Sequence, residues 1–228
     1  MAAAIIGIYA LHVKQANHLN HKSFAVLMSL SQPPARPPLI LASSSPYRAQ
    51  QLQRAGLTFD VHAPAVDESQ TAHETPFGLA ARLARSKCQQ VADRHGDKVV
   101  IGGDQVAELH GQMLGKAGQP EAALAQLLAC QGQQIELHSA CAVYDPQTAQ
   151  VDCQVVSTQL TFRDYPEAML RQYIALDQPL DCAGSFKIER AGILLFSAVR
   201  GSDPSAIEGL PMITLMSQLL AIGYAPFA

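Results

Sequence analysis

The sequence predicts an α/β fold whose sheet mixes parallel and antiparallel strands. A short buried strand, Leu39–Ala42, leads directly into a helical segment that begins at Pro46. Residues 135–144 and 151–163 are rich in Val, Thr and aromatic side chains and flank a turn at residues 145–147, the pattern of an antiparallel hairpin. Because strand–helix units and a hairpin occur in one chain, we expect a mixed sheet with helices packed against it.

The first helix and the loop before it form a candidate phosphate site. Ser45 suits an N-cap, Pro46 suits the first helical turn, and Gly56 suits the end of the helix. A strand, a serine loop and a helix N-terminus in succession bring free backbone N–H groups and the positive end of the helix dipole to one spot. Arg48 projects near the same spot.

A second helix is expected from Thr75 toward Arg94. Its apolar residues recur at spacings of three and four, and this stripe consists of Phe77, Ala80, Leu83, Ala84, Cys88 and Val91. Lys87 borders the stripe, so its ammonium can reach a cleft while its stem stays packed. The alternative is a solvated basic face that Lys87 shares with Arg82 and Arg85.

The strand at residues 99–106 carries an acid in its middle, Asp104, directly after two glycines. Asp is depleted in strands, and a buried unpaired carboxylate is costly. The glycines let a ligand or another backbone come close. We therefore expect Asp104 to face a metal ion, a lysine or a substrate; an Asp in a strand-end turn is the alternative.

The remaining elements complete the sheet and its cover. After Gly115 and Lys116, the expected elements are a helix at 120–130, the hairpin, a helix at 166–176, a strand at 193–199 and a last helix at 211–222.

Composition narrows the function classes. Of the 228 residues, 48% are hydrophobic and 15% are charged, which excludes an intrinsically disordered chain. No apolar run approaches the roughly 20 residues of a membrane-spanning helix, so we expect a soluble protein without a membrane partner. The net charge of -3 argues against a nucleic-acid polymer as partner but permits a small-molecule nucleotide. The sequence leaves a homodimer open.

Cysteines and histidines form no recognisable framework. The five cysteines are widely spaced, without a CxxC pair, which indicates reduced thiols, so we expect a cytoplasmic protein. Only His18 and His21 are close together, and no HExxH motif occurs. No metal role is assigned to histidine.

Residues 1–38 differ in character from the rest of the chain. They contain no acidic residue, and prolines cluster between positions 33 and 38, as in an extended linker. We expect a disordered extension here, or a true start at Met28, followed by a single domain over residues 39–228.

Acids and cations recur among the polar residues that stand out. They are Asp67, Glu68, Asp104, Arg48, Lys87 and Lys116. This mixture suits a polyphosphate held with a divalent ion, because cations hold the phosphates while carboxylates hold the metal or activate water.

Several motifs in order resemble the Maf family of nucleotide pyrophosphatases. They are LILASSSPYR, APAVDE, LAARLARSK, VIGGDQV, GK, PLDCAGSFKIE and IEGLP, and the resemblance runs from Leu39 to the last helix. It implies a Maf/ITPase-like α/β fold: a mixed, twisted, elongated sheet flanked by helices, with two lobes around a central cleft. It also implies hydrolysis of a nucleoside triphosphate between its α and β phosphates, with Mg²⁺, Mn²⁺ or Co²⁺ as the divalent cation.

The resemblance also implies roles for individual residues. Ser43 and Arg48 match the family's phosphate-binding loop. The family's catalytic set is matched by Glu68, Lys87, Asp104 and Lys116. Asp104 resembles the proton acceptor, and both Asp104 and Glu68 are candidate metal ligands; how base and metal duties divide between them stays open.

Three positions resemble the branch of the family that prefers 7-methyl-GTP: Tyr47, Gln105 and Glu189. Methylation at N7 places positive charge on guanine, which an acid neutralises and which an aromatic face attracts by about 0.5–2 kcal/mol. Glu189 and Tyr47 supply these groups, although related sequences often carry Trp in place of Tyr47. The alternatives are a dTTP/UTP pyrophosphatase of the same family and a non-catalytic nucleotide-binding regulator of cell division.

Overall fold

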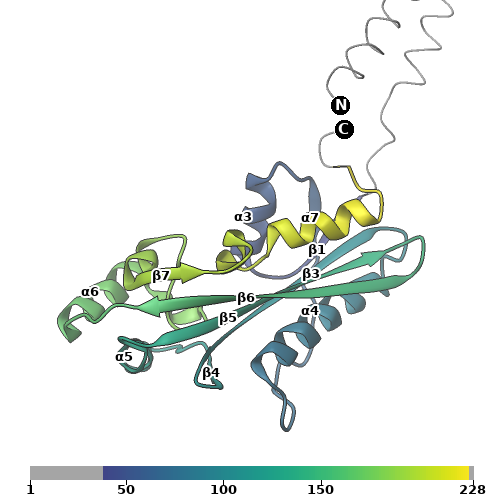
Figure 1. The fold of residues 1–228 in the computed structure, drawn as a ribbon. Helices are drawn as coiled ribbons and strands as arrows, with labels where there is room; N and C mark the ends of the chain where they lie inside the picture. The colour runs from purple at the N-terminus through teal and green to yellow at the C-terminus, as the bar shows by residue number, and fades with distance from the viewer. Residues whose placement is uncertain (1–37, 226–228) are drawn as a thin grey trace, which may run out of the picture. The chain divides into compact units, whose positions relative to one another are not determined.

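The computed structural model describes residues 38–225, which are built on a seven-stranded sheet (Figure 1). The strands are β1 (Leu39–Ala42), β2 (Phe59–Val61), β3 (Val99–Leu109), β4 (Gln112–Leu114), β5 (Gln134–Asp145), β6 (Gln150–Phe162) and β7 (Phe196–Arg200). The prediction for residues 1–38 lies, apart from Pro38, outside the described residues. The single domain over 39–228 stays a prediction.

The sheet has the predicted mixture of strand directions. Its order is β2-β1-β3-β5-β6-β7, with β4 paired to β3. β1 runs parallel to β2 and β3, and the other pairs are antiparallel. The sequence analysis missed β2 and β4, because a strand of three residues is too short to show a period of two.

Five α-helices are found in the described part of the chain: α3 (Pro46–Arg54), α4 (Pro76–Ala92), α5 (Pro120–Cys130), α6 (Glu167–Asp177) and α7 (Met212–Ala221). Short 3₁₀ turns follow at η1 (Pro179–Asp181), η2 (Ala191–Leu195) and η3 (Pro204–Glu208). Proline begins each of the first three helices, and the Ser45 and Thr75 side chains accept backbone N–H groups at the N-termini of α3 and α4. None of the described helices combines the length and hydrophobicity that crossing a bilayer requires.

Two local predictions were wrong. The strand expected at 193–199 begins only at Phe196, because residues 191–195 form a 3₁₀ turn. There the N–H of Gly192 donates to Lys187 and to the buried carboxylate of Asp177 instead of to a neighbouring strand. Phe77 was expected in the buried stripe of α4, but it is 48% exposed.

The first half of the sheet separates two hydrophobic cores. On one face, α4 packs its apolar stripe against β1, β3 and β5. On the other face, α3 and α7 cover alternate residues of the same strands (Figure 1). The two periodicities, 3.6 on the helices and 2 on the strands, together produce this three-layered lobe.

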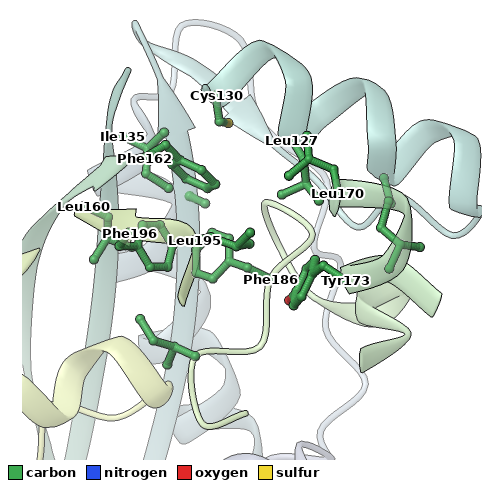
Figure 2. Packing of buried hydrophobic residues seen from close by; sticks show 14 of the residues in the cluster. Leu127, Cys130, Ile135, Leu160, Phe162, Leu170, Tyr173, Phe186, Leu195 and Phe196 are labelled. Atoms are coloured by element: carbon green, nitrogen blue, oxygen red, sulfur yellow. The ribbon is translucent and has the colours of Figure 1, made fainter. Parts of the chain in front are cut away.

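A second lobe is built on the far ends of β3, β5 and β6. It is covered by α5, α6 and β7, and its buried side chains gather around Phe162, Phe186 and Phe196 (Figure 2). These three rings meet edge to face, with centroids 4.6 to 6.1 Å apart. Figure 2 also shows Leu127 of α5 and Leu170 of α6 pointing into the same core. The predicted elongated sheet with helices and two lobes is confirmed.

Candidate active site

A cleft of about 370 Å³ lies between the two lobes. Its walls include every site residue that the family resemblance implied: Ser43, Tyr47, Arg48, Glu68, Lys87, Asp104, Gln105, Lys116 and Glu189. The first lobe contributes the serine loop, Lys87 and Asp104, whereas the second lobe contributes Lys116 and the segment from Asp181 to Glu189.

The serine loop, residues 43–45, is held in place by hydrogen bonds to the side chain of Ser43. Ser43 is buried, and its Oγ accepts the N–H of Ser45 at 3.1 Å and the Arg48 guanidinium at 3.3 Å. Arg48 also donates from Nε to the carbonyl of Gly209 at 3.2 Å. Burial lowers the pKa of Arg48, while Asp104 and Glu68 act in the opposite direction. An arginine in this state stays charged and offers its guanidinium to an anion.

Lys87 and Asp104 form a buried ion pair in the floor of the cleft. Lys87 Nζ lies 2.6 Å from Asp104 Oδ1, and the two side chains are only 8% and 11% exposed. The expectation that Asp104 faces a partner is met by a lysine, and Lys87 does not belong to a solvated basic face. A charge removed from water needs such a partner, because its desolvation is otherwise uncompensated.

Glu68 joins this pair from the loop before α4. Its Oε1 lies 2.6 Å from Lys87 Nζ, while its side chain is 55% exposed to the cleft. The hydrogen bond from Lys87 lowers the pKa of Glu68, and Lys116 and Arg48 lower it further. Asp67 does not join the site, since it does not line the cleft and its Oδ1 accepts the N–H and hydroxyl of Ser69.

The two acids have the chemistry of a divalent-metal site. Lys87 engages Asp104 Oδ1 and Glu68 Oε1, and the second oxygen of each carboxylate makes no hydrogen bond with the described residues. Carboxylate oxygens are the ligands that Mg²⁺ and Mn²⁺ prefer, with phosphate oxygens and waters completing the shell. Asp104 and Glu68 therefore fit such an ion.

The other end of the cleft is lined by a mixed apolar and charged surface. Tyr47 faces Lys187, whose Nζ lies 5.8 Å from the ring centroid and 3.1 Å from Asp181 Oδ1. The Glu189 residue is exposed on one side, while desolvation of its carboxyl on the protein side and the neighbouring Glu208 raise its pKa. The sequence analysis missed Lys187, although the residue stands inside the motif that contains Glu189.

The side-chain amide of Gln105 is hydrogen-bonded to other residues in the wall of the cleft. Its Nε2 donates to Ser139 Oγ and to the carbonyl of Ala206, each at 2.9 Å. The buried hydroxyl of Ser139 donates to the same carbonyl at 2.7 Å. Gln105 thus holds the η3 segment in position, and only its carbonyl oxygen is left to meet a ligand.

A second group with metal-binding chemistry lies outside the cleft lining. Glu108, Glu136 and His138 place one ligand atom each within 4.8 Å of one another. The sequence analysis missed this group because its members come from two strands, and only their register brings them together.

Comparisons with known proteins agree with this arrangement. Residues 38–222 match the model of the family described as "Maf-like protein". The chain is 47% identical over 199 residues to "7-methyl-GTP pyrophosphatase" of Paraburkholderia xenovorans, covering 86% of this chain and 96% of that protein. It is 46% identical to the Ralstonia nicotianae protein of the same name, covering 85% of this chain and 100% of the relative.

A solved HAM1 protein from Coxiella burnetii has 14% sequence identity, covers 81% of this chain and 98% of that chain, and has a TM-score of 0.44. The family model spans all the described helices and strands. The matches to relatives that are nearly half identical extend over almost the full length of those relatives. The chain therefore belongs to the Maf-like protein family.

Proposed function

We propose that the protein is a cytoplasmic pyrophosphatase that removes 7-methyl-GTP by cutting it between the α and β phosphates. The products are the nucleoside monophosphate and pyrophosphate. The observation that carries this proposal is the Lys87–Asp104–Glu68 group beside the Arg48–Ser43 loop in one cleft. The names of the relatives at 46% and 47% identity support the same substrate.

The triphosphate chain binds where the cations converge. Arg48, fixed by Ser43 and Gly209, offers its guanidinium to the phosphate oxygens. Lys116 approaches from the second lobe and is exposed to the cleft. Because both groups are positioned before the substrate arrives, they stabilise the charge that grows on the leaving pyrophosphate at little reorganisation cost.

Hydrolysis is an in-line attack of water on the α-phosphorus. The water oxygen forms a bond to phosphorus, the bond to the bridging α–β oxygen breaks, and pyrophosphate leaves with that electron pair. Asp104 accepts the proton of the water or orients it, and Lys87 holds the carboxylate at 2.6 Å. A divalent ion held by Glu68 and Asp104 would supply Lewis-acid stabilisation of the phosphate charge.

The end of the cleft beside Tyr47 selects the nucleobase. The ammonium of Lys187, paired with Asp181, lies 5.8 Å from the Tyr47 ring centroid, so we place the base against the opposite ring face. Glu189 supplies negative charge for the methylated ring and an acceptor for its Watson–Crick edge.

A panel of triphosphates tests the proposal. Purified protein with Mg²⁺, Mn²⁺ or Co²⁺ is assayed for pyrophosphate release from 7-methyl-GTP, GTP, dTTP and UTP. We expect the highest kcat/KM for 7-methyl-GTP. A preference for dTTP and UTP establishes the alternative activity, and no release from any triphosphate refutes the enzymatic function.

The substitution Asp104→Asn separates an enzyme from a nucleotide-binding regulator. Loss of a proton acceptor lowers kcat by about 10²–10⁴-fold, whereas nucleotide affinity, measured by calorimetry, is largely kept. Asp60→Asn is the matched control, because Asp60 is an exposed acid on β2 that pairs only with Lys98 among the described residues. Unchanged kcat in Asp104→Asn contradicts the mechanism.

A further inference from the structure

The strand that carries Asp104 carries a second acidic position outside the cleft. Glu108 lies four residues farther along β3, about 13 Å at the usual rise per residue. It pairs with Glu136 of β5, and Val106 pairs with His138, so Glu108, Glu136 and His138 share one face of the sheet. Their three ligand atoms lie within 4.8 Å of one another.

The imidazole of His138 is buried and aimed into this group. His138 is 5% exposed, and its Nδ1 lies 2.7 Å from the hydroxyl of Ser157. Its Nε2 lies 3.5 Å from Glu108 Oε1 and 3.8 Å from Glu136 Oε2, and it makes no hydrogen bond with any described residue. The polar atoms of a side chain as buried as His138 normally have partners.

The spacing of the three atoms matches that of ligands around an ion. Ligand atoms about 2.1 Å from one metal lie about 3 to 3.5 Å apart in tetrahedral or octahedral geometry, close to the 3.5 and 3.8 Å found here. The two carboxylates form no ion pair with lysine or arginine in the described part of the chain, so no cationic side chain there offsets their mutual repulsion.

The surroundings support ligation as well. Ser157 orients the ring through Nδ1, and Gln159 Nε2 lies 3.5 Å from the other oxygen of Glu136. Metal-binding histidines and carboxylates are usually oriented by such outer partners. The Glu136 side chain is 38% exposed, which gives an ion a route in from solvent.

We propose that Glu108, Glu136 and His138 bind a divalent transition-metal ion, separate from the metal that serves hydrolysis. Imidazole favours Zn²⁺ and Co²⁺, carboxylate favours Mn²⁺, and Mg²⁺ is disfavoured because it prefers an all-oxygen shell. The ion fastens β3 to β5, so its binding stabilises the folded chain.

Cobalt titration of the full chain tests the site. Co²⁺ is added to the Glu68→Gln/Asp104→Asn double variant, in which the cleft ligands are removed, and visible ligand-field absorption and bound cobalt are measured. We expect one bound equivalent with a nitrogen–oxygen spectrum. Adding Glu108→Gln or Glu136→Gln to this background abolishes that equivalent, whereas Glu121→Gln, an exposed acid on α5, leaves it unchanged.

A second measurement keeps the test independent of folding defects. Zn²⁺ is expected to raise the Tm of the Glu68→Gln/Asp104→Asn variant, but not that of the same variant carrying Glu136→Gln, whose apo Tm serves as its own baseline. Equal cobalt binding in Glu108→Gln, Glu136→Gln and the parent variant overturns the proposal, as does a parent variant that binds no cobalt. Neither result bears on pyrophosphate release.

Discussion

A single ammonium group organises the candidate catalytic centre. Lys87 Nζ contacts the carboxylates of both Asp104 and Glu68 at 2.6 Å. It thereby holds two negative charges close to the Arg48 guanidinium. The sequence analysis predicted a partner for Asp104 because a buried acid in a strand needs one. It could not choose among metal, lysine and substrate, because Lys87 is seventeen residues away along the chain and only the packing of α4 brings it near.

At the scale of single residues, Glu189→Gln tests how the site selects the nucleobase. Replacing the acid removes the negative charge beside the methylated ring and keeps the size of the side chain. We expect the ratio of kcat/KM for 7-methyl-GTP over GTP to fall roughly ten- to a hundredfold, the equivalent of one hydrogen bond to a charged group. Steady-state assays with both substrates measure the ratio, and an unchanged preference excludes Glu189 from selection.

The ion pair between Glu74 and Arg82 makes the stability of the fold depend on pH in the acidic range. Its carboxylate oxygens lie 2.7 and 2.9 Å from the Arg82 guanidinium, which lowers the pKa of Glu74 to about 2. Because the folded pKa lies below the unfolded one, the stabilisation is present above about pH 4.5 and is lost as pH falls toward about 2.

Urea unfolding of wild type and Glu74→Gln across this range measures the effect. We expect the wild type to be more stable at pH 6, with the difference shrinking steadily between pH 4.5 and 2. Glu121→Gln, an exposed acid on α5, serves as the control. A difference that does not change with pH would show that the Glu74–Arg82 pair does not titrate with folding.

At the scale of elements, the contact between α4 and β3 positions Lys87 beside Asp104. A Cβ at Gly102 would stand 2.4 Å from the carbonyl of Ala84 and 2.7 Å from Cys88 Cβ, so only glycine lets the helix lie this close. The two glycines before Asp104 were expected to allow a close approach, and the approaching partner at Gly102 is a helix backbone. Proximity of this kind is set by packing and has no local sequence signal.

Gly102→Ala should therefore affect both stability and catalysis. Overpacking against backbone that cannot yield costs typically about 1–3 kcal/mol, and a displaced α4 moves Lys87 away from Asp104, which lowers kcat. Gly115→Ala is the matched control for stability, because a Cβ there meets no atom within 4 Å. Chemical denaturation and steady-state kinetics check both effects, and equal stability of the two variants refutes the packing argument.

For the molecule as a whole, the cleft depends on both lobes at once. The serine loop and Asp104 belong to the first lobe, and Lys116 and Glu189 belong to the second. A nucleotide that contacts both lobes holds them together, so binding is expected to slow local opening on both sides of the cleft.

A non-hydrolysable α,β-methylene analogue of 7-methyl-GTP tests this coupling. At a hundred times its Kd, ligand linkage predicts about 2.7 kcal/mol of added stability, measured as a rise in Tm. Hydrogen exchange should slow at residues 43–48 and at residues 182–189 together. Protection confined to one of these segments would contradict a substrate that spans the cleft.

The sequence alone determined most of the longer elements and the residue types that the cleft holds. Proline and serine helix caps, hydrophobic periods and an acid in the middle of a strand are signals carried by residues close together in the chain. From these signals α3, α4, α5, the hairpin and the need of Asp104 for a partner were predicted. Only the tertiary structure decided that Lys87 neutralises two acids, that Gln105 supports η3, and that Glu108, Glu136 and His138 meet. Those arrangements depend on strand register and helix packing, which arise from contacts between residues far apart in the chain.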